Sequence, residues 1–172
     1  MLVKSNRKGA VVDKAQSWTY AEHIVAESDV VRVAREHAAD LGVEALSAAT
    51  GHFLTCLAAM GVKTIAEIGT GTGVSALYLL AASTDSVLTS IDTDAEAQGY
   101  ARENLAAAHI RPGRFRLING RSSDMLPRLA SRSYDLVLVD GDPLEAAGDV
   151  SEALRMLRPG GVVVVHNATA SG

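Results

Sequence analysis

The sequence has little cysteine, few aromatic residues and no excess of basic charge. Its 172 residues include one cysteine, Cys56, and 4% aromatic residues, with 16 basic against 20 acidic side chains and a net charge of -4. A single cysteine cannot form an internal disulfide, so a disulfide-stabilised secreted fold is excluded. Cys56 lies in an apolar run, and we expect a buried, unreactive thiol. The acidic balance gives no overall field that would attract nucleic acid or anionic lipid.

Long hydrophobic segments are also absent. No stretch approaches the roughly 20 apolar residues of a membrane span, and no apolar segment follows the early basic residues to make a signal peptide. We therefore expect a soluble, cytoplasmic protein. The length suits a single domain. We expect residues 1–14 to be a disordered or tag-like N-terminus and residues 15–172 to form the domain.

Two kinds of hydrophobic pattern divide the chain. Up to Gly61 the pattern is helical, with Ser28 or Asp29 placed to cap one helix that stops at Gly42, and with Ser47 before a second helix. After Gly61, short apolar runs alternate with amphipathic segments. The runs rich in Val, Ile and Leu, which we interpret as strands, are residues 64–68, 87–91, 114–118, 134–139 and 161–165.

Helix signals lie between these runs. Residues 74–82 are apolar throughout, and Thr93 with Glu96 forms a capping box. Pro143, behind Asp142, is placed at the first turn of a further helix. The alternation of five strands with four helices predicts an α/β, Rossmann-like, doubly wound fold. We expect a parallel sheet in the order 3-2-1-4-5, with the N-terminal helices packed on it.

The strongest functional signal is the segment IAEIGTGTGVS at residues 65–75, a strand followed by a glycine-rich turn and a helix start. Glycines let the backbone approach a ligand closely, and the free N–H groups of a helix start favour an anionic group. Asp92 ends the next strand and is placed to accept hydrogen bonds from ribose hydroxyls. The segment therefore predicts a nucleoside-containing ligand. The dinucleotide pattern G-x-G-x-x-G does not fit, because Val74 or Ala76 stands where its third glycine would fall.

The turn instead reads G-x-G-x-G, with Glu67 two residues before the first glycine. This pattern resembles motif I of class I S-adenosylmethionine (SAM) methyltransferases. Over residues 28–170 the chain resembles the catechol / caffeoyl-CoA O-methyltransferase family, and most of all its actinobacterial branch. The matching segments are EIGTGTGVS at 67–75, ID at 91–92, NGRS at 119–122, LP at 126–127, YDLVLVDGD at 134–142 and LRPGG at 157–161.

The resemblance implies a SAM site and assigns residues to it. The implied cofactor-binding residues are Leu46, Glu67, Gly69, Thr70, Gly71, Gly73, Ser75, Asp92, Ser122 and Asp140. Among them, the resemblance gives Asp92 the ribose and the backbone of Ser122 the adenine edge. Asp140 follows the fourth strand, and ligands of open α/β sheets bind at the carboxyl ends of strands.

The chain departs from the family at three positions. Catechol-methylating members bind a divalent cation through the equivalent of Asp140 and an Asp-Asn pair, but the pair here is His166-Asn167. Because Mg²⁺ prefers oxygen ligands, we expect any metal held by Asp140 and Asn167 to be weak or absent. Pro143 replaces the family lysine that is the usual general base, and Arg121 replaces an aspartate.

We expect a SAM-dependent O-methyltransferase that acts on a hydroxyl of an unidentified small molecule, with no nucleic-acid partner. Asp140, His166 and Asn167 are the expected acceptor-binding residues. His166 is the candidate base, since histidine ordinarily titrates near pH 6.5. Two alternatives stay open: a SAM-binding protein without catalysis, and a methyltransferase acting on RNA or protein. The acidic composition argues against RNA.

The family normally continues past the fifth strand with a helix and two more strands. This sequence stops seven residues after Val165, which leaves the valines of residues 162–165 on the outer edge of the predicted sheet. An exposed run of valines is a template for pairing with another chain. We therefore expect either that the sequence lacks a C-terminal portion, with strands 6 and 7 of the family, or that a homodimer covers this edge.

Overall fold

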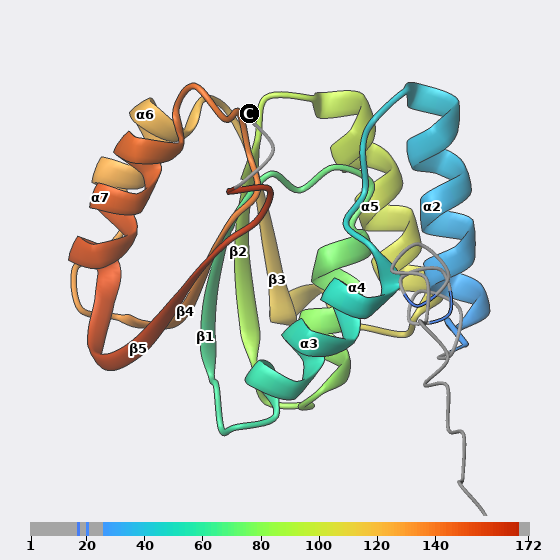
Figure 1. Ribbon diagram of the computed structural model, residues 1–172, viewed down its shortest axis with the longest axis horizontal. Coiled ribbons are helices and arrows are strands. Elements are labelled where there is room, and N and C mark those ends of the chain that lie inside the picture. The colour runs from blue at the N-terminus through green and yellow to red at the C-terminus, as the bar shows by residue number, and fades with distance from the viewer. Residues whose placement is uncertain (1–16, 18–19, 21–25, 169–172) are drawn as a thin grey trace, which may run out of the picture.

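The computed structural model describes residues 26–168 together with Ser17 and Tyr20, and it shows a parallel sheet between two layers of helices (Figure 1). The N-terminal segment expected at residues 1–14 lies outside the described residues. All pairs of neighbouring strands are parallel, and the strand order β3-β2-β1-β4-β5 confirms the prediction. The strands are β1 (Thr64–Ile68), β2 (Val87–Asp92), β3 (Phe115–Asn119), β4 (Tyr134–Val139) and β5 (Leu157–Val165).

The helices cover both faces of the sheet, as Figure 1 shows. Along β4, Leu136 and Leu138 pack toward one layer and Val137 and Val139 toward the other, because successive side chains of a strand point to opposite faces. This explains why the strands are apolar on both sides. The first layer holds α2 (Asp29–Leu41), α3 (Ala48–Ala58), α4 (Val74–Ala81) and α5 (Ala95–Ala107), and the second holds α6 (Ser122–Met125) and α7 (Ala146–Met156).

Local side-chain chemistry sets the helix boundaries. Ser28 and Ser47 cap α2 and α3 as predicted, and Gly42, with φ +67°, ends α2. The predicted cap at Thr93 is wrong. Asp94 caps α5 instead, because its carboxylate accepts the amide protons of residues 96 and 97. Within the described residues, no helix has the length and apolar content needed to cross a membrane.

The segment between β4 and α7 differs from the prediction. The helix expected to begin at Pro143 begins at Ala146. The Asp142 carboxylate accepts the N–H of Leu144 at 2.9 Å, and the Asp142 carbonyl accepts the N–H of Glu145 at 3.0 Å. These bonds close a turn before the helix starts, so residues 142–145 form a loop at the end of β4.

The strand β5 forms the outer edge of the sheet beside β4. It begins at Leu157, four residues before the predicted strand, and its register with β4 shifts between Tyr134 and Leu136. In the described part of the chain β5 pairs with β4 alone. Its Val162 and Val165 side chains therefore stay 41% and 37% exposed.

Cys56 is exposed, contrary to the expectation of a buried thiol. Helix α3 buries Gly51, Leu54 and Ala58 against the core. Because each residue of an α-helix advances by about 100°, these three positions share one face and Cys56 lies on another. The apolar run around Cys56 therefore includes positions on both faces of α3.

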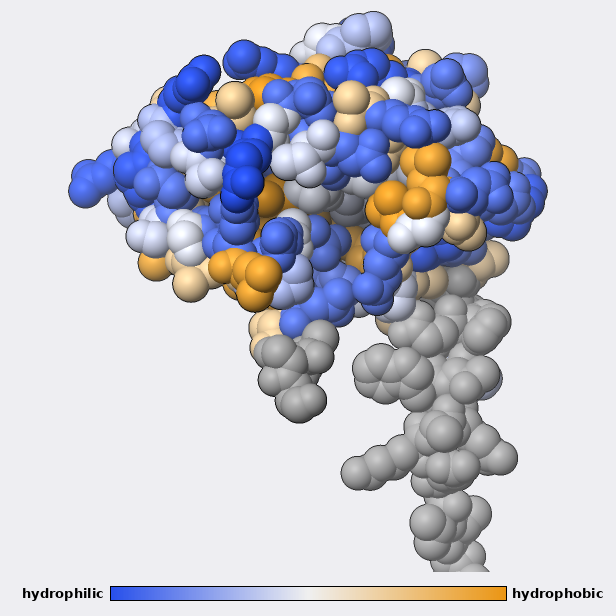
Figure 2. Space-filling view, turned by 90° about the horizontal axis from the view of Figure 1, so that it is seen from above, coloured by the Kyte–Doolittle hydropathy of each residue, from blue (hydrophilic) through white to orange (hydrophobic). Residues whose placement is uncertain are grey.

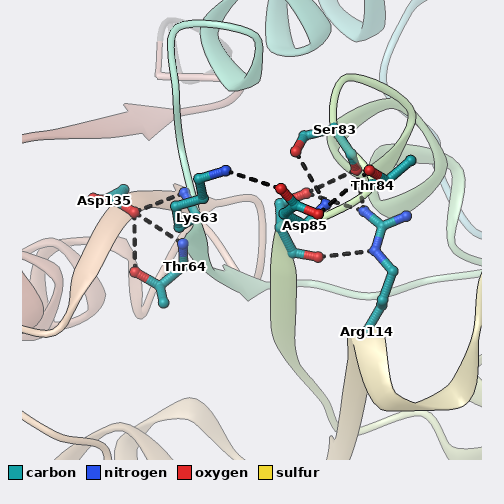
Figure 3. A network of polar contacts seen from close by, with 8 residues as sticks. Lys63, Thr64, Ser83, Thr84, Asp85, Arg114 and Asp135 are labelled. Carbon is teal, nitrogen blue, oxygen red and sulfur yellow. Dashed lines mark hydrogen bonds and ion pairs between the residues drawn. The ribbon is translucent and has the colours of Figure 1, made fainter.

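Polar contacts at the amino ends of the strands hold the loops there (Figure 3). The Asp135 carboxylate accepts the backbone N–H groups of Lys63 and Thr64 at 2.8 and 2.9 Å. Arg114 donates to the carbonyl groups of Leu80 and Ser86, which closes the connection between α4 and β2. Residues at this end thus stabilise the fold, whereas the predicted site residues gather at the opposite end.

Candidate active site

Two adjoining cavities lie at the carboxyl ends of β1, β2 and β4. Gly69, Asp92 and Asp140 line both cavities, so together they form one crevice. The crevice lies where the strand order reverses between β1 and β4, which is the usual ligand site of an open parallel sheet. Figure 2 looks onto the molecule from above and shows a hollow bordered mainly by hydrophilic residues.

The structure brings most of the predicted site residues to this crevice. Those that line the first cavity are Leu46, Gly69, Thr70, Gly71, Ser75, Asp92 and Asp140. Ser122 lines the second cavity, with Gly69, Asp92 and Asp140. Four predicted residues are outside the lining of both cavities: Glu67, Gly73, His166 and Asn167.

The glycine-rich turn brings backbone to the crevice. Gly69, Gly71 and Gly73 have φ values of +93°, +48° and +87°, which favour glycine. A side chain on Gly69 would clash with the carbonyl oxygen of Asp140, so the turn packs directly on the end of β4. Gly73 precedes α4 without a side-chain cap. The first N–H groups of α4 are therefore free for an anionic group.

Asp92 joins the turn to the second strand. Its Oδ2 accepts the N–H of Gly71 at 2.8 Å, and its Oδ1 accepts the N–H of Asp94 at 2.9 Å. Each carboxylate oxygen has two lone pairs, so one acceptor position on each oxygen remains. Asp92 can thus accept hydrogen bonds from two adjacent hydroxyl groups.

Glu67 is fully buried beneath the turn, at the end of a chain of hydrogen bonds. The Gln98 amide donates to Thr70 at 3.1 Å, and Ser90 donates to Glu67 Oε2 at 2.5 Å. Because the Ser90 proton is used, the Thr70 hydroxyl donates to Ser90 across 2.7 Å. Glu67 Oε1 has no partner among the described residues. Burial raises the pKa of Glu67 to about 7, and the nearby hydroxyl groups of Ser75 and Ser90 oppose this shift.

An unpartnered, buried carboxylate oxygen is costly unless a ligand or water completes its contacts. A cationic group next to Glu67 would favour the charged form and lower its pKa. Although Glu67 does not itself line the first cavity, its buried charge beneath the turn suits a positively charged ligand there.

Asp140 and His166 form a pair at the ends of β4 and β5. The backbone N–H of His166 donates to the Val139 carbonyl at 2.9 Å and continues the pairing of the two strands. The ring Nδ1 of His166 lies 2.7 Å from Asp140 Oδ1, and the side chains of His166 and Asp140 are 17% and 20% exposed. Burial raises the pKa of Asp140, and His166 opposes this shift. With Nδ1–H donating to Asp140, Nε2 is the nitrogen that can accept a proton.

Asn167 is exposed and adopts a left-handed conformation, with φ +53°. Residues 26–168 contain no group of three or more His, Cys, Asp or Glu side chains placed to hold a metal ion. That any metal held by Asp140 and Asn167 is weak or absent stays a prediction.

Three acidic residues at the crevice were not among the predicted site residues: Glu44, Asp142 and Glu145. Glu44 lies between α2 and α3 and lines the first cavity, and the other two line the second. No Lys, Arg or His is among the described residues that line either cavity. A lining of carboxylates favours a cation and disfavours a pyrophosphate group. Asp142 comes three residues after the buried strand β4, and this position was the signal that could have indicated the loop.

A separate cavity of about 820 Å³ lies between helices of the first layer, and none of the predicted site residues lines it. Its Glu27 carboxylate already accepts hydrogen bonds from Arg35 at 2.8 and 2.9 Å and from Tyr78 at 2.5 Å. The Glu27 carboxylate is thus already satisfied, Arg114 is bound to backbone carbonyl groups, and this cavity is not the candidate active site.

Comparisons with known proteins show the family of the chain. A family model described as a methyltransferase domain matches residues 66–168. A relative from Mycolicibacterium vanbaalenii, which carries an O-methyltransferase name, is 46% identical over 155 residues, or 89% of this chain and 69% of the relative.

Two solved structures extend the likeness to three dimensions. A protein from Corynebacterium glutamicum is 33% identical, with a TM-score of 0.82 over 88% of this chain and 73% of that one. The O-methyltransferase TomG from Streptomyces achromogenes, involved in tomaymycin synthesis and solved in complex with SAM, is 28% identical. Its TM-score is 0.79 over 88% of this chain and 70% of that one. The chain therefore belongs to the methyltransferase family, as the resemblance in its sequence predicted.

Proposed function

We propose that this protein is a SAM-dependent O-methyltransferase that acts on a hydroxyl group of a small molecule. The observation that carries this proposal is the acidic crevice at the carboxyl ends of β1, β2 and β4. SAM presents a sulfonium and an ammonium group, both cationic, together with a ribose diol and an adenine. A lining of carboxylates without a basic residue suits this ligand and disfavours polyanionic RNA.

The two cavities accommodate the two ends of SAM. The methionine end occupies the first cavity, where the start of α4 receives its carboxylate and the negative charge of Glu67 stabilises its ammonium. Asp92 lines both cavities and accepts hydrogen bonds from the ribose hydroxyls. The adenine then lies in the second cavity beside Ser122.

The acceptor hydroxyl binds next to Asp140, with Asn167 nearby. When bound, SAM supplies a methyl group activated by its cationic sulfur. Asp140 holds the His166 ring by accepting its Nδ1–H, and Nε2 takes the proton of the acceptor hydroxyl. Positioning of the acceptor oxygen supplies much of the remaining rate enhancement. This arrangement gives the chain a base although Pro143 replaces the family lysine, and it requires no metal.

A cytoplasmic location and a homodimer complete the proposal. The exposed, unpaired Cys56 accords with a reducing compartment.

The exposed valines of the β5 edge support pairing with a second copy. Sedimentation equilibrium should then give twice the chain mass of 18.0 kDa. A single species at the chain mass would contradict the homodimer.

A methyl-transfer screen tests the proposed function. The protein is incubated with SAM labelled in its methyl group and a panel of phenols, catechols and aliphatic alcohols, with matched panels of amines, thiols and RNA. We expect label in an ether product and formation of S-adenosylhomocysteine, both retained in the presence of EDTA. Label only on nitrogen or sulfur would contradict the O-methyltransferase assignment, and label only on RNA would contradict a small-molecule acceptor. Loss of turnover with EDTA would show that a metal is required.

A further inference from the structure

The second cavity has a carboxylate on its wall that no sequence motif indicated. Glu145 lies directly before α7 and lines this cavity together with Gly120 and Ser122. The turn closed by Asp142 places it there, because α7 begins only at Ala146. Its side chain is 27% exposed, so it belongs to the wall of the cavity more than to the solvent surface.

Two donors hold the Glu145 carboxylate in position. The Ser122 hydroxyl donates to Oε2 at 3.0 Å, and Arg121 forms an ion pair with Oε1. Ser122 is 7% exposed and starts α6, so the contact fixes Glu145 against the floor of the cavity. Each carboxylate oxygen can accept two hydrogen bonds, so both oxygens can accept one more. The carboxylate is therefore a positioned acceptor for a ligand donor.

The other carboxylates of this cavity are less available as hydrogen-bond acceptors for the base. Asp92 is shared with the first cavity, and the proposed function assigns its remaining acceptor positions to the ribose hydroxyls. Asp140 is paired with His166. Asp142 is exposed, and its Oδ1 accepts the N–H of a neighbouring residue. Glu145 is thus the acidic side chain whose partners point it at the cavity and leave it free to accept.

We propose that Glu145 selects adenine as the base of the cofactor, by accepting a hydrogen bond from its 6-amino group. This inference rests on the proposed function, which puts the adenine in the second cavity. The 6-amino group of adenine is a donor, and an ionised carboxylate only accepts. Hypoxanthine carries an acceptor oxygen at the same position, so it would leave two acceptors facing each other without a proton between them. Such an unpaired polar contact is rejected strongly.

Binding of S-adenosylhomocysteine and of its deaminated analogue, S-inosylhomocysteine, tests this inference. Calorimetry on the wild-type protein should show a preference for the adenine compound of about tenfold to a hundredfold. Glu145→Gln should reduce this preference by about tenfold, because the glutamine amide can also donate to the 6-oxo group. Glu152→Gln is the matched control. This control also replaces a glutamate with glutamine, but at a position within α7, where Glu152 pairs with Arg155 outside the crevice. It should keep the wild-type preference.

The possible failures are distinguishable. If Glu145→Gln keeps the wild-type preference, or weakens both compounds equally, Glu145 only joins α6 to α7 and the inference is wrong. Thermal unfolding of the variant shows whether an equal loss reflects a damaged fold. Ser122→Ala removes the hydroxyl that holds the Glu145 carboxylate, and it should also reduce the preference. If the wild-type protein binds neither compound, the proposed function itself fails, and the inference fails with it.

Discussion

Replacing His166 with alanine is expected to lower kcat by about 10²–10⁴-fold while SAM affinity stays near the wild-type value. The His166 ring contacts Asp140 at 2.7 Å but does not line either cofactor cavity. Its loss should therefore remove the base without removing a cofactor contact. Turnover is measured with an acceptor found in the methyl-transfer screen, and SAM affinity is measured by calorimetry.

Two further variants separate a base from a structural residue. Asp140→Asn should cause a comparable loss, because an asparagine amide can donate to Nδ1 and leave the proton on Nε2. His109→Asn is the control, since His109 is exposed with φ +56° and asparagine tolerates this conformation. It should keep full activity. Added imidazole should restore part of the activity of His166→Ala, and turnover of His166→Ala close to wild type would contradict the assignment.

Glu67→Gln is expected to raise the free energy of unfolding by up to about 3 kcal/mol above pH 7, and to weaken SAM binding. Burial raises the folded-state pKa of Glu67 to about 7 from its ordinary value of 4.5, and each pKa unit corresponds to about 1.36 kcal/mol. The folded state thus binds this proton more tightly than the unfolded state. The stability that the protonated group contributes is present below the ordinary pKa and is lost as the pH rises to about 7.

Urea unfolding at acidic and alkaline pH measures this effect. Glutamine stays neutral, so the difference between Glu67→Gln and wild type should be small near pH 5 and largest near pH 8. Glu103→Gln, an exposed position on α5, should show no such trend. A difference that does not change with pH would contradict the buried ionisation. An unchanged SAM affinity would show that Glu67 does not stabilise the cofactor.

The sheet and its order could be predicted because the strands are short, apolar runs that alternate with helices. The helix starts at Ser28 and Ser47 were predictable for a similar reason, since each residue caps the helix that directly follows it. The start of α7 was not predictable in this way. The Asp142 carboxylate could cap a helix or close a turn, and the structure shows the turn. The exposure of Cys56 likewise depends on which face of α3 meets the core.

In the candidate site, too, some residues could be predicted from local sequence and others depend on tertiary packing. The glycine-rich turn and Asp92 were indicated by local sequence, and both line the crevice. The contact between Asp140 and His166, 26 residues apart, follows from the pairing of Val139 with Val165 in neighbouring strands. Glu44 and Glu145 could not be assigned from sequence, because each lies in a connection whose path depends on tertiary packing.

Calorimetric titration of SAM into the wild-type protein and into Asp92→Ala tests most directly whether the crevice is the cofactor site. Asp92 offers its remaining acceptor positions to the ribose, and loss of a charge-assisted hydrogen bond weakens binding by about tenfold to a hundredfold. Asp92→Asn is the companion variant, because it keeps an acceptor for the N–H of Gly71. We expect one SAM per chain for the wild type, no heat from NAD, and weaker SAM binding for both variants. An unchanged SAM affinity in Asp92→Ala, or a preference of the wild type for NAD, would contradict the assignment of this site.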